Sequence, residues 1–206
     1  MDNKQKIQWK AYELFKRFGV RSVTMDEIAQ QCGVSKKTVY QFFEDKDTLV
    51  ESIVETFTKR SEENCTRQQG AAENAIEEIF LSIDLLEEMI EGVNPALIND
   101  LRKYHSAAYA KMERHKNEFM GEFFRKNIER GIEEGLYRTD FKTDIITPFY
   151  LHSSMVAIEQ DIFPRKYSVA DTNYEISMFI LYGLATGKGS KLIDKYKLQR
   201  LKLNTL

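Results

Sequence analysis

The sequence predicts an all-α protein with a small three-helix domain at the N-terminus and a larger helical domain after it. Proline is scarce, with 3 residues among 206, and glycine is modest, with 10, so few positions interrupt a helix. Apolar residues recur at helical spacing along most of the chain. Ser, Thr and Asp stand where helices should begin, and Gly stands where several should end.

The first expected helix is an amphipathic segment that ends at Gly19. Its apolar stripe has the three- and four-residue spacing of one helix face. The members of this stripe are Ile7, Ala11, Leu14, Phe15 and Phe18.

Two short helices across a glycine turn are expected next. Thr24 and Glu27 have the spacing of a capping box, which starts a helix at Thr24. Ile28 and Cys32 lie one turn apart on that helix and form a small apolar face. Gly33 accepts the left-handed conformation and ends it.

Ser35 can cap the second short helix, which we expect to run to about Phe43, with Val39 and Phe43 in the core. Asp45 can cap a third helix. Its apolar stripe comprises Leu49, Val50, Ile53, Val54 and Phe57. A three-helix unit of this size is only marginally stable alone, so we expect it to pack against the rest of the chain.

The outer face of the second short helix predicts DNA binding. Lys36 and Lys37 stand in its first turn, where the helix dipole disfavours cations. Lysines at such unfavourable positions suggest that they bind an anion, such as a DNA phosphate. Thr38, Tyr40 and Gln41 offer groups that bond phosphates or read base edges in a major groove. Each residue alone also suits an ordinary solvated surface, and the prediction rests on the set. The predicted DNA contacts are Thr24, Ser35, Lys36, Lys37, Thr38, Tyr40, Gln41 and Lys46.

With these residues, the sequence resembles the tetracycline-repressor (TetR) family of transcriptional regulators. The matching residues are Ala11, Leu14, Phe15, Gly19, Thr24, Ile28, Ala29, Gly33, Val34, Ser35, Thr38, Val39, Tyr40, Phe43, Lys46 and Leu49. A weaker match is the turn at Glu134–Phe141. Two features depart from the family pattern: Phe42 replaces a residue with a polar tip, and two adjacent Lys occupy positions where smaller residues are frequent. Both departures concern which operator is read.

The resemblance implies a homodimer in which residues 1–48 form a helix-turn-helix DNA-binding domain and residues 49–206 form a helical domain for ligand binding and dimerisation. It also implies a repressor that a small-molecule ligand releases from a pseudo-palindromic operator. Activation in place of repression remains open, as does ligand-promoted DNA binding.

The charge distribution is consistent with a local basic patch. The net charge is −2; residues 1–60 hold 11 Lys and Arg against 9 Asp and Glu, and the remainder holds 19 against 23. Long-range steering toward DNA is therefore weak, and specific contacts must contribute more of the binding. Low basicity also disfavours the alternative of a nonspecific DNA-coating protein.

Other classes of site find little support in the sequence. Cys32 and Cys65 have no metal-ligand spacing; Cys32 suits a small buried position, and Cys65 is the better candidate for a redox switch. No metal site, no cofactor and no enzymatic activity are expected. No apolar run approaches the ~20 residues of a membrane span, and the N-terminus has no signal-peptide pattern, so we expect a cytoplasmic protein.

The second domain reads as a series of helices. Residues 60–70 could be the end of the helix from Asp45 or a loop, closed by Gly70. Further helices are expected over about 76–90, 96–103, 106–134, 144–159 and from Asp171 or Thr172 to about 185, followed by a short helix or a tail at 190–206. A loop with Pro164 is expected over 161–168.

The 144–159 helix and the helix ending near 185 carry apolar residues on more than one face, which favours a dimer interface over a merely thicker core. Aromatic and Met residues could line a cavity for a partly apolar effector, although at helical spacing such residues are also ordinary core. The predicted ligand contacts are Phe80, Phe119, Met120, Phe123, Tyr150 and Met155.

Overall fold

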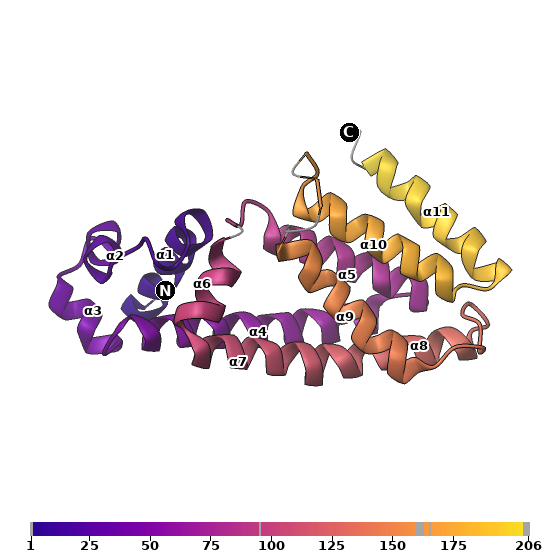
Figure 1. Cartoon of the computed structure of the whole chain (residues 1–206), viewed down its shortest axis with the longest axis horizontal. Coiled ribbons are helices and arrows are strands. Elements are labelled where there is room, and N and C mark those ends of the chain that lie inside the picture. The colour runs from indigo at the N-terminus through magenta and orange to yellow at the C-terminus, as the bar shows by residue number, and fades with distance from the viewer. Residues whose placement is uncertain (1, 95, 160–162, 165, 204–206) are drawn as a thin grey trace. The chain divides into compact units, whose positions relative to one another are not determined.

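The all-α prediction is confirmed by the structure, a computed structural model that describes residues 2–94, 96–159, 163–164 and 166–203 (Figure 1). Within these ranges no β-strand occurs, and one isolated antiparallel bridge joins Tyr137 and Ala185. The helical elements are α1 (Asn3–Phe18), α2 (Met25–Cys32), α3 (Lys36–Phe42), α4 (Lys46–Ala71), α5 (Ala75–Ile90), α6 (Ala96–Tyr104), α7 (Ser106–His115), the π-helical turn η1 (Lys116–Met120), α8 (Gly121–Glu133), α9 (Thr143–Glu159), α10 (Val169–Leu184) and α11 (Gly187–Leu203).

The chain divides into two compact units, each built from two stretches of sequence. The first unit comprises residues 1–61 and 92–115, and the second comprises residues 62–91 and 116–206. The first unit is therefore larger than the predicted segment 1–48, because the beginning of α4, together with α6 and α7, packs on the N-terminal helices. The assignment of DNA binding to 1–48 stays a prediction.

The first unit encloses a continuous apolar core. Ile7, Ile28, Val39 and Leu49, one from each of α1 to α4, are fully buried in it. Leu101 of α6 and Ala108 of α7 complete this core. The added helices supply the apolar surface that three short helices alone cannot bury.

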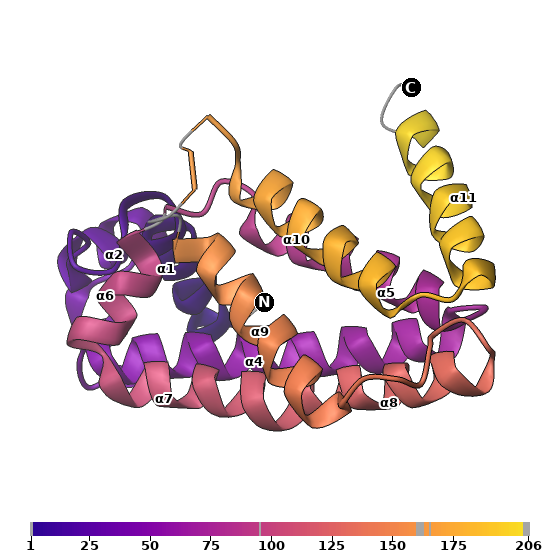
Figure 2. The ribbon, with the colours of Figure 1, turned by 45° about the vertical axis from the view of Figure 1, so that its right-hand side comes forward.

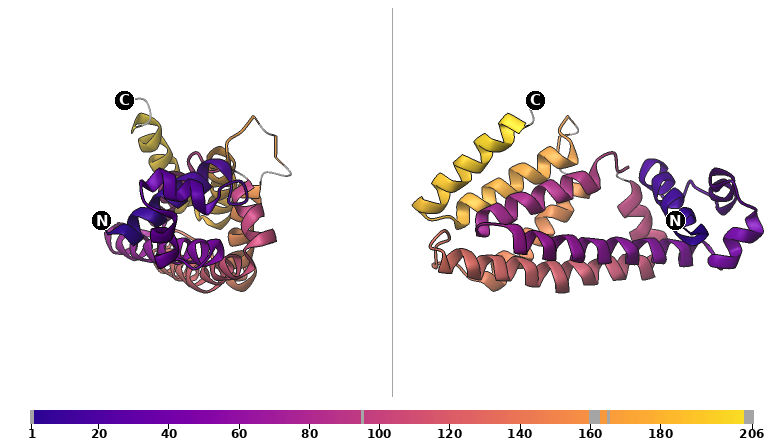
Figure 3. Two further views of the ribbon diagram at one scale, coloured as in Figure 1. Left: turned by 90° about the vertical axis from the view of Figure 1, so that its left-hand side faces the viewer. Right: turned by 180° about the vertical axis from the view of Figure 1, so that it is seen from behind.

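The second unit has its own core between α5, α8, α10 and α11. Ile76, Ile128, Leu181 and Ile193 are buried in it, one from each of these helices. Figure 2 shows α10 running beside α5, and the rear view in Figure 3 shows α11 on the far side of α10 from α9.

Several helix boundaries differ from those predicted. The polar stretch 60–70 is helical, and α4 continues past Gly70 to Ala71. Ser168, not Asp171 or Thr172, caps α10, because its side chain accepts the Asp171 N–H while the Asp171 carboxylate accepts the Ser168 N–H. The stretch expected to be a short helix or a tail belongs, as far as residue 203, to the 17-residue helix α11. Part of the predicted loop 161–168 lies outside the described residues.

The predicted long helix over 106–134 is interrupted. Five residues, Lys116–Met120, form a π-helical turn between α7 and α8. Such turns carry one extra residue in the helix and change the direction of the side chains that follow.

Within the described ranges, none of the helices combines the length and the apolar character that a membrane span requires.

Candidate nucleic-acid interface

Local capping positions α2 and α3 as the sequence predicts. The Thr24 hydroxyl accepts the Glu27 N–H at 3.2 Å, and the Glu27 carboxylate accepts the Thr24 N–H at 2.6 Å. Gly33 ends α2 with φ of +65°. The Ser35 hydroxyl then accepts the Thr38 N–H at 3.1 Å and starts α3. These bonds span three residues each, so they form wherever the local sequence permits.

The buried side of α3 holds it against the first unit's core. Val39 is fully buried, and Phe43, which follows the last turn of α3, is buried as well. Fixing these two side chains leaves Lys36, Lys37, Tyr40 and Gln41 exposed. The predicted contact residues of α3 therefore share an outward surface, which we call the α3 surface, defined by these four residues.

Lys36 is already paired in the free protein. Its ammonium lies 2.8 Å from one carboxylate oxygen of Asp26 on α2, and this bond raises the pKa of Lys36. The ammonium also lies 5.9 Å from the centre of the Tyr40 ring. A phosphate would have to compete with Asp26 for this lysine. The sequence analysis did not predict the ion pair between Lys36 and Asp26.

Lys37 is the opposite case. It is exposed, and it makes no hydrogen bond or ion pair with any residue that the structure describes. A cation with no internal partner can bind an external anion without first breaking an existing bond. Lys37 is thus the residue of the α3 surface best prepared to contact a phosphate.

The half-buried hydroxyl of Thr38 is less available than the sequence suggested. It lies 2.8 Å from the Ser35 hydroxyl, so these two predicted contacts bond each other. One of the two hydroxyls donates this bond and has no hydrogen left for another, whereas its partner can still donate and both keep acceptor capacity.

Thr24 and Lys46 flank the same end of α2. The Thr24 hydroxyl lies 2.9 Å from the Glu27 carboxylate, whose pKa is lowered by the bond from the Thr24 N–H. Burial lowers the pKa of Lys46, while the charges of Asp100, Asp47 and Glu27 oppose that shift. The Glu27 carboxylate beside the Thr24 hydroxyl makes Thr24 a weaker phosphate site than its capping position alone indicates.

A polar clamp from residues distant in sequence holds the connection between α1 and α2. The Asp100 carboxylate of α6 accepts the Arg21 N–H at 2.8 Å, and the Arg21 guanidinium donates to the Tyr104 hydroxyl at 3.2 Å. Just before α6, the Asn94 N–H donates to the Lys16 carbonyl at 2.8 Å. Gly19 fits here because a Cβ on it would lie 2.9 Å from Asp100 Oδ2.

No local sequence pattern predicts the clamp, because the residues that form it lie about 80 positions apart. A lone Asp within an amphipathic helix such as α6 reads as a solvated residue. Only its burial beside a glycine turn reveals its role.

Known transcriptional regulators resemble this chain in sequence. Residues 10–53 match the sequence model of the family described as "Bacterial regulatory proteins, tetR family". A curated relative, the HTH-type transcriptional regulator YvaF of Bacillus subtilis, is 31% identical over 112 residues. The N-terminal segment of the chain therefore matches the TetR family. This match covers 53% of the chain and 57% of YvaF, so the chain spans a little over half of that relative's length.

Solved structures described as TetR-family proteins share the fold of most of the chain. A TetR-family regulator from Agrobacterium tumefaciens has a TM-score of 0.75 at 17% identity, covering 89% of this chain and 97% of its own. The repressor FadR of Thermus thermophilus, solved in complex with lauroyl-CoA, has a TM-score of 0.58 at 17% identity, covering 89% and 96%. The family fold therefore extends beyond the matched N-terminal segment.

The predicted ligand residues all lie in the second unit, where the structure shows them packed. Phe80 is buried with its ring 5.6 Å from that of Tyr196, and Tyr150 stacks on Phe124 at 4.2 Å. Phe123 is buried, and Phe119, Met120 and Met155 are half-buried. Their role in ligand binding stays a prediction.

A surface hollow of about 470 Å³ lies in this unit, and none of the predicted ligand residues lines it. Its lining is Leu136, Lys188, Lys191 and Leu192. Among the described residues, no group of three or more His, Cys, Asp or Glu is placed to hold a metal ion.

Proposed function

We propose that this protein is a sequence-specific DNA-binding transcriptional regulator, a repressor that a small-molecule ligand releases from its operator. The observation that carries the proposal is the α3 surface: two lysines, a tyrosine hydroxyl and a glutamine amide, held outward by the buried Val39. The family match over residues 10–53 supports the same reading. No catalytic step is part of the proposal.

The chemistry of the α3 surface suits a major groove. A glutamine amide can pair with adenine through two hydrogen bonds, and a lysine can donate to guanine or to a phosphate. The Tyr40 hydroxyl is exposed and suits a phosphate oxygen. Lys37 would bind DNA directly, whereas Lys36 would first leave Asp26, so we assign the larger share of the phosphate contacts to Lys37.

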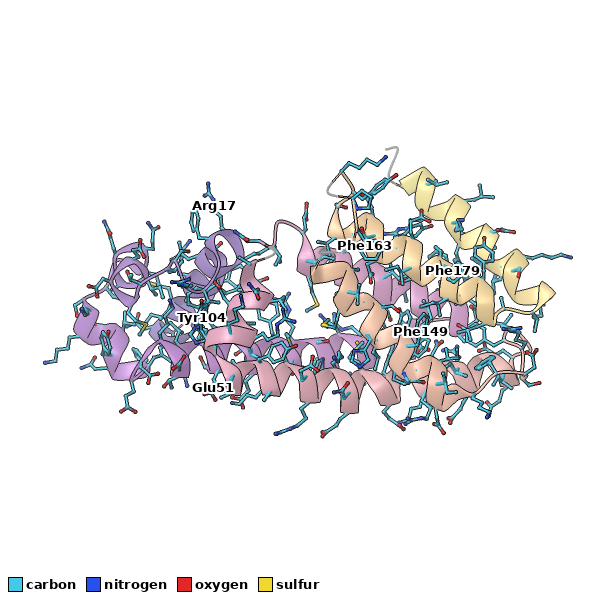
Figure 4. All side chains as sticks on the ribbon, in the orientation of Figure 1. Arg17, Glu51, Tyr104, Phe149, Phe163 and Phe179 are labelled. Atoms are coloured by element: carbon cyan, nitrogen blue, oxygen red, sulfur yellow. The ribbon has the colours of Figure 1, made fainter. Side chains whose placement is uncertain are left out.

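A homodimer would supply the second recognition helix. Helix-turn-helix proteins read two half-sites about one helical turn (~34–36 Å) or a multiple apart, which requires two copies. α9 exposes Ile145 and Phe149 at 61% and 55%, and α10 exposes Phe179 at 80%. Phe149 and Phe179 are labelled in Figure 4. Large apolar side chains exposed on two neighbouring helices suit an isologous interface of four helices.

Ligand control would pass through helices that belong to both units. α4 begins in the first unit and ends in the second, and the run from α7 through η1 into α8 does the same. A ligand that prefers one arrangement of the second unit would change DNA affinity by linkage. The FadR structure with lauroyl-CoA shows a relative of this fold with a small molecule bound.

The test is selection of genomic DNA fragments by the purified protein, followed by footprinting at low and near-physiological salt. One protected inverted repeat that persists at the higher salt is the expected result. Diffuse protection that salt abolishes would refute specific readout and favour a nonspecific DNA-coating protein. We place this action in the cytoplasm, where DNA binding would occur.

A further inference from the structure

The ion pair between Asp26 and Lys36 joins α2 to α3 on the exposed side of the first unit. The Lys36 ammonium lies 2.8 Å from one carboxylate oxygen of Asp26 and donates a hydrogen bond of 3.1 Å to the other. The side chains of Lys36 and Asp26 are 60% and 64% exposed. Because Lys36 belongs to the α3 surface, a ligand that contacts Lys36 there also comes within reach of the Asp26 carboxylate.

A carboxylate on a surface that faces DNA is unfavourable by itself, because the phosphates repel it. An acidic residue in a first helical turn ordinarily complements the helix dipole, and Glu27 already does so, since its carboxylate accepts the Thr24 N–H. Among the described residues, the Asp26 carboxylate accepts from Lys36 and from no backbone N–H. Asp26 therefore belongs to the outer surface and not to the cap of α2.

Lys36 is positioned by two neighbours in the free protein. Besides its bond to Asp26, the ammonium lies 5.9 Å from the centre of the Tyr40 ring. An ammonium has three hydrogens to donate, so at least one of them is left for an external acceptor. A side chain that is already ordered loses less entropy on binding than a mobile one. The ion pair thus presents a donor and an acceptor side by side.

We propose that Asp26 and Lys36 together read one C·G base pair in each operator half-site. The Asp26 carboxylate accepts from cytosine N4, and the Lys36 ammonium donates to guanine O6 or N7. On DNA, Lys36 exchanges a bond with Asp26 for the guanine, and the carboxylate oxygen so released turns to the cytosine. This inference rests on the proposed function and names a base pair that the regulator recognises.

The spacing of the ion pair matches that of the base-pair edge. Cytosine N4 and guanine O6 are hydrogen-bonded to each other within the base pair, so they lie about 3 Å apart. The carboxylate oxygens of Asp26 lie 2.8 and 3.1 Å from the Lys36 ammonium. The protein's donor and acceptor can therefore lie alongside the acceptor and donor of the base pair, each opposite its complement.

Other partners in the DNA fit this ion pair less well. In an A·T pair, the adenine N6 donor lies between two acceptors, adenine N7 and thymine O4, and both repel a carboxylate. In a C·G pair, both acceptors belong to guanine and the cytosine donor stands at one end. A phosphate accepts from Lys36 but repels Asp26, so it satisfies only half of the ion pair.

The test is selection of double-stranded DNA from a randomised library by the full chain, followed by anisotropy titration of the selected operator and its single-base-pair variants. We expect one C·G pair in each half-site at which substitution weakens binding by about tenfold. Asp26→Asn should lose the preference for cytosine at that pair and favour adenine, because an asparagine amide bonds adenine N6 and N7. Preferences at the other positions should stay unchanged.

Three further variants separate base reading from charge. Lys36→Ala should relax the preference at the same base pair, whereas Lys37→Ala should weaken binding to all sequences alike, as expected for a phosphate contact. The control Glu122→Gln removes one acidic charge from an exposed ion pair with Arg125 on α8 of the second unit. It should leave the selected sequence unchanged. Asp26→Asn should fold normally, because the ion pair that it breaks is exposed and the capping box of α2 is retained.

Two results would overturn the proposal. If Asp26→Asn binds every operator variant more tightly by the same factor, Asp26 only competes with phosphates for Lys36. If the base preferences of Asp26→Asn equal those of the original chain, Asp26 reads no base. Either result, in a chain that selects an operator, refutes this inference and leaves the proposed function standing. A chain that selects no sequence refutes the proposed function and this inference with it.

Discussion

Lys37→Ala should weaken operator binding through the loss of one phosphate contact in each protomer. Lys37 is exposed and has no partner among the described residues, so its removal leaves the fold of α3 unchanged. Its neighbours Val39 and Phe43 keep α3 in place. The loss should therefore appear in DNA affinity and not in the thermal unfolding midpoint.

The size of the effect follows from counterion release. Each phosphate contact adds about 0.9 to the slope of log affinity against log salt, so a dimer that loses two contacts loses about 1.8 from that slope. Between about 50 and about 200 mM salt, the ratio of original to variant affinity should shrink by about twelvefold. Lys36→Ala should have a smaller effect, because Lys36 gives up its Asp26 bond in order to bind DNA.

The assay is a fluorescence-anisotropy titration of a labelled operator at four or more salt concentrations, for the original chain and both lysine variants. Analytical ultracentrifugation checks that the dimer is intact. An unchanged salt slope for Lys37→Ala, or a larger loss for Lys36→Ala, would refute the assignment of the main phosphate contact to Lys37.

Three further predictions concern stability. Gly131→Ala should destabilise the protein by about 1–3 kcal/mol, because the new Cβ would lie 2.1 Å from the ring of the buried Tyr137; Gly70→Ala, with open space around it, is the matched control and should stabilise α4 slightly in the same thermal unfolding measurement. Asp100→Ala leaves the Arg21 N–H without its acceptor and should cost about 1–3 kcal/mol; hydrogen exchange at the Arg21 amide should accelerate, and an unchanged rate would argue against the clamp. The folded-state pKa of Glu27 is lowered by the Thr24 N–H, so its contribution to stability is present above the ordinary carboxyl pKa and is lost as pH falls through the lowered value. Chemical denaturation should accordingly show the stability difference between the original chain and Glu27→Ala shrinking at acid pH, and a constant difference would contradict this reasoning.

The helix boundaries of the N-terminal domain were predictable because their signals are local. Thr24, Gly33 and Ser35 act on groups within three to five residues of themselves, and the structure has each in its expected conformation. The predicted start of α10 was wrong: Asp171 and Thr172 were expected to cap the helix, whereas both lie inside its first turns and Ser168 is the cap. A cap is chosen by backbone geometry, and several neighbouring residues offered the same side-chain chemistry.

The candidate site was only partly predictable. The exposed positions of α3 follow from helical periodicity once Val39 and Phe43 are assigned to the core. Their pairing does not follow, since the Lys36–Asp26 contact joins two helices and depends on how those helices cross. The same limit applies to the predicted ligand residues: Phe80 and Phe123 are buried and Tyr150 stacks on Phe124, while their role in ligand binding stays a prediction.

By itself, the sequence determined the all-α fold, the two capped helices across Gly33 and the outward lysines, because capping and helical periodicity act over a few residues. The tertiary structure alone decided the division into units, the clamp from Asp100 to Arg21 and the pairing of Lys36 with Asp26. Those features join segments far apart in the chain, and their energies arise only when packing removes water from both partners.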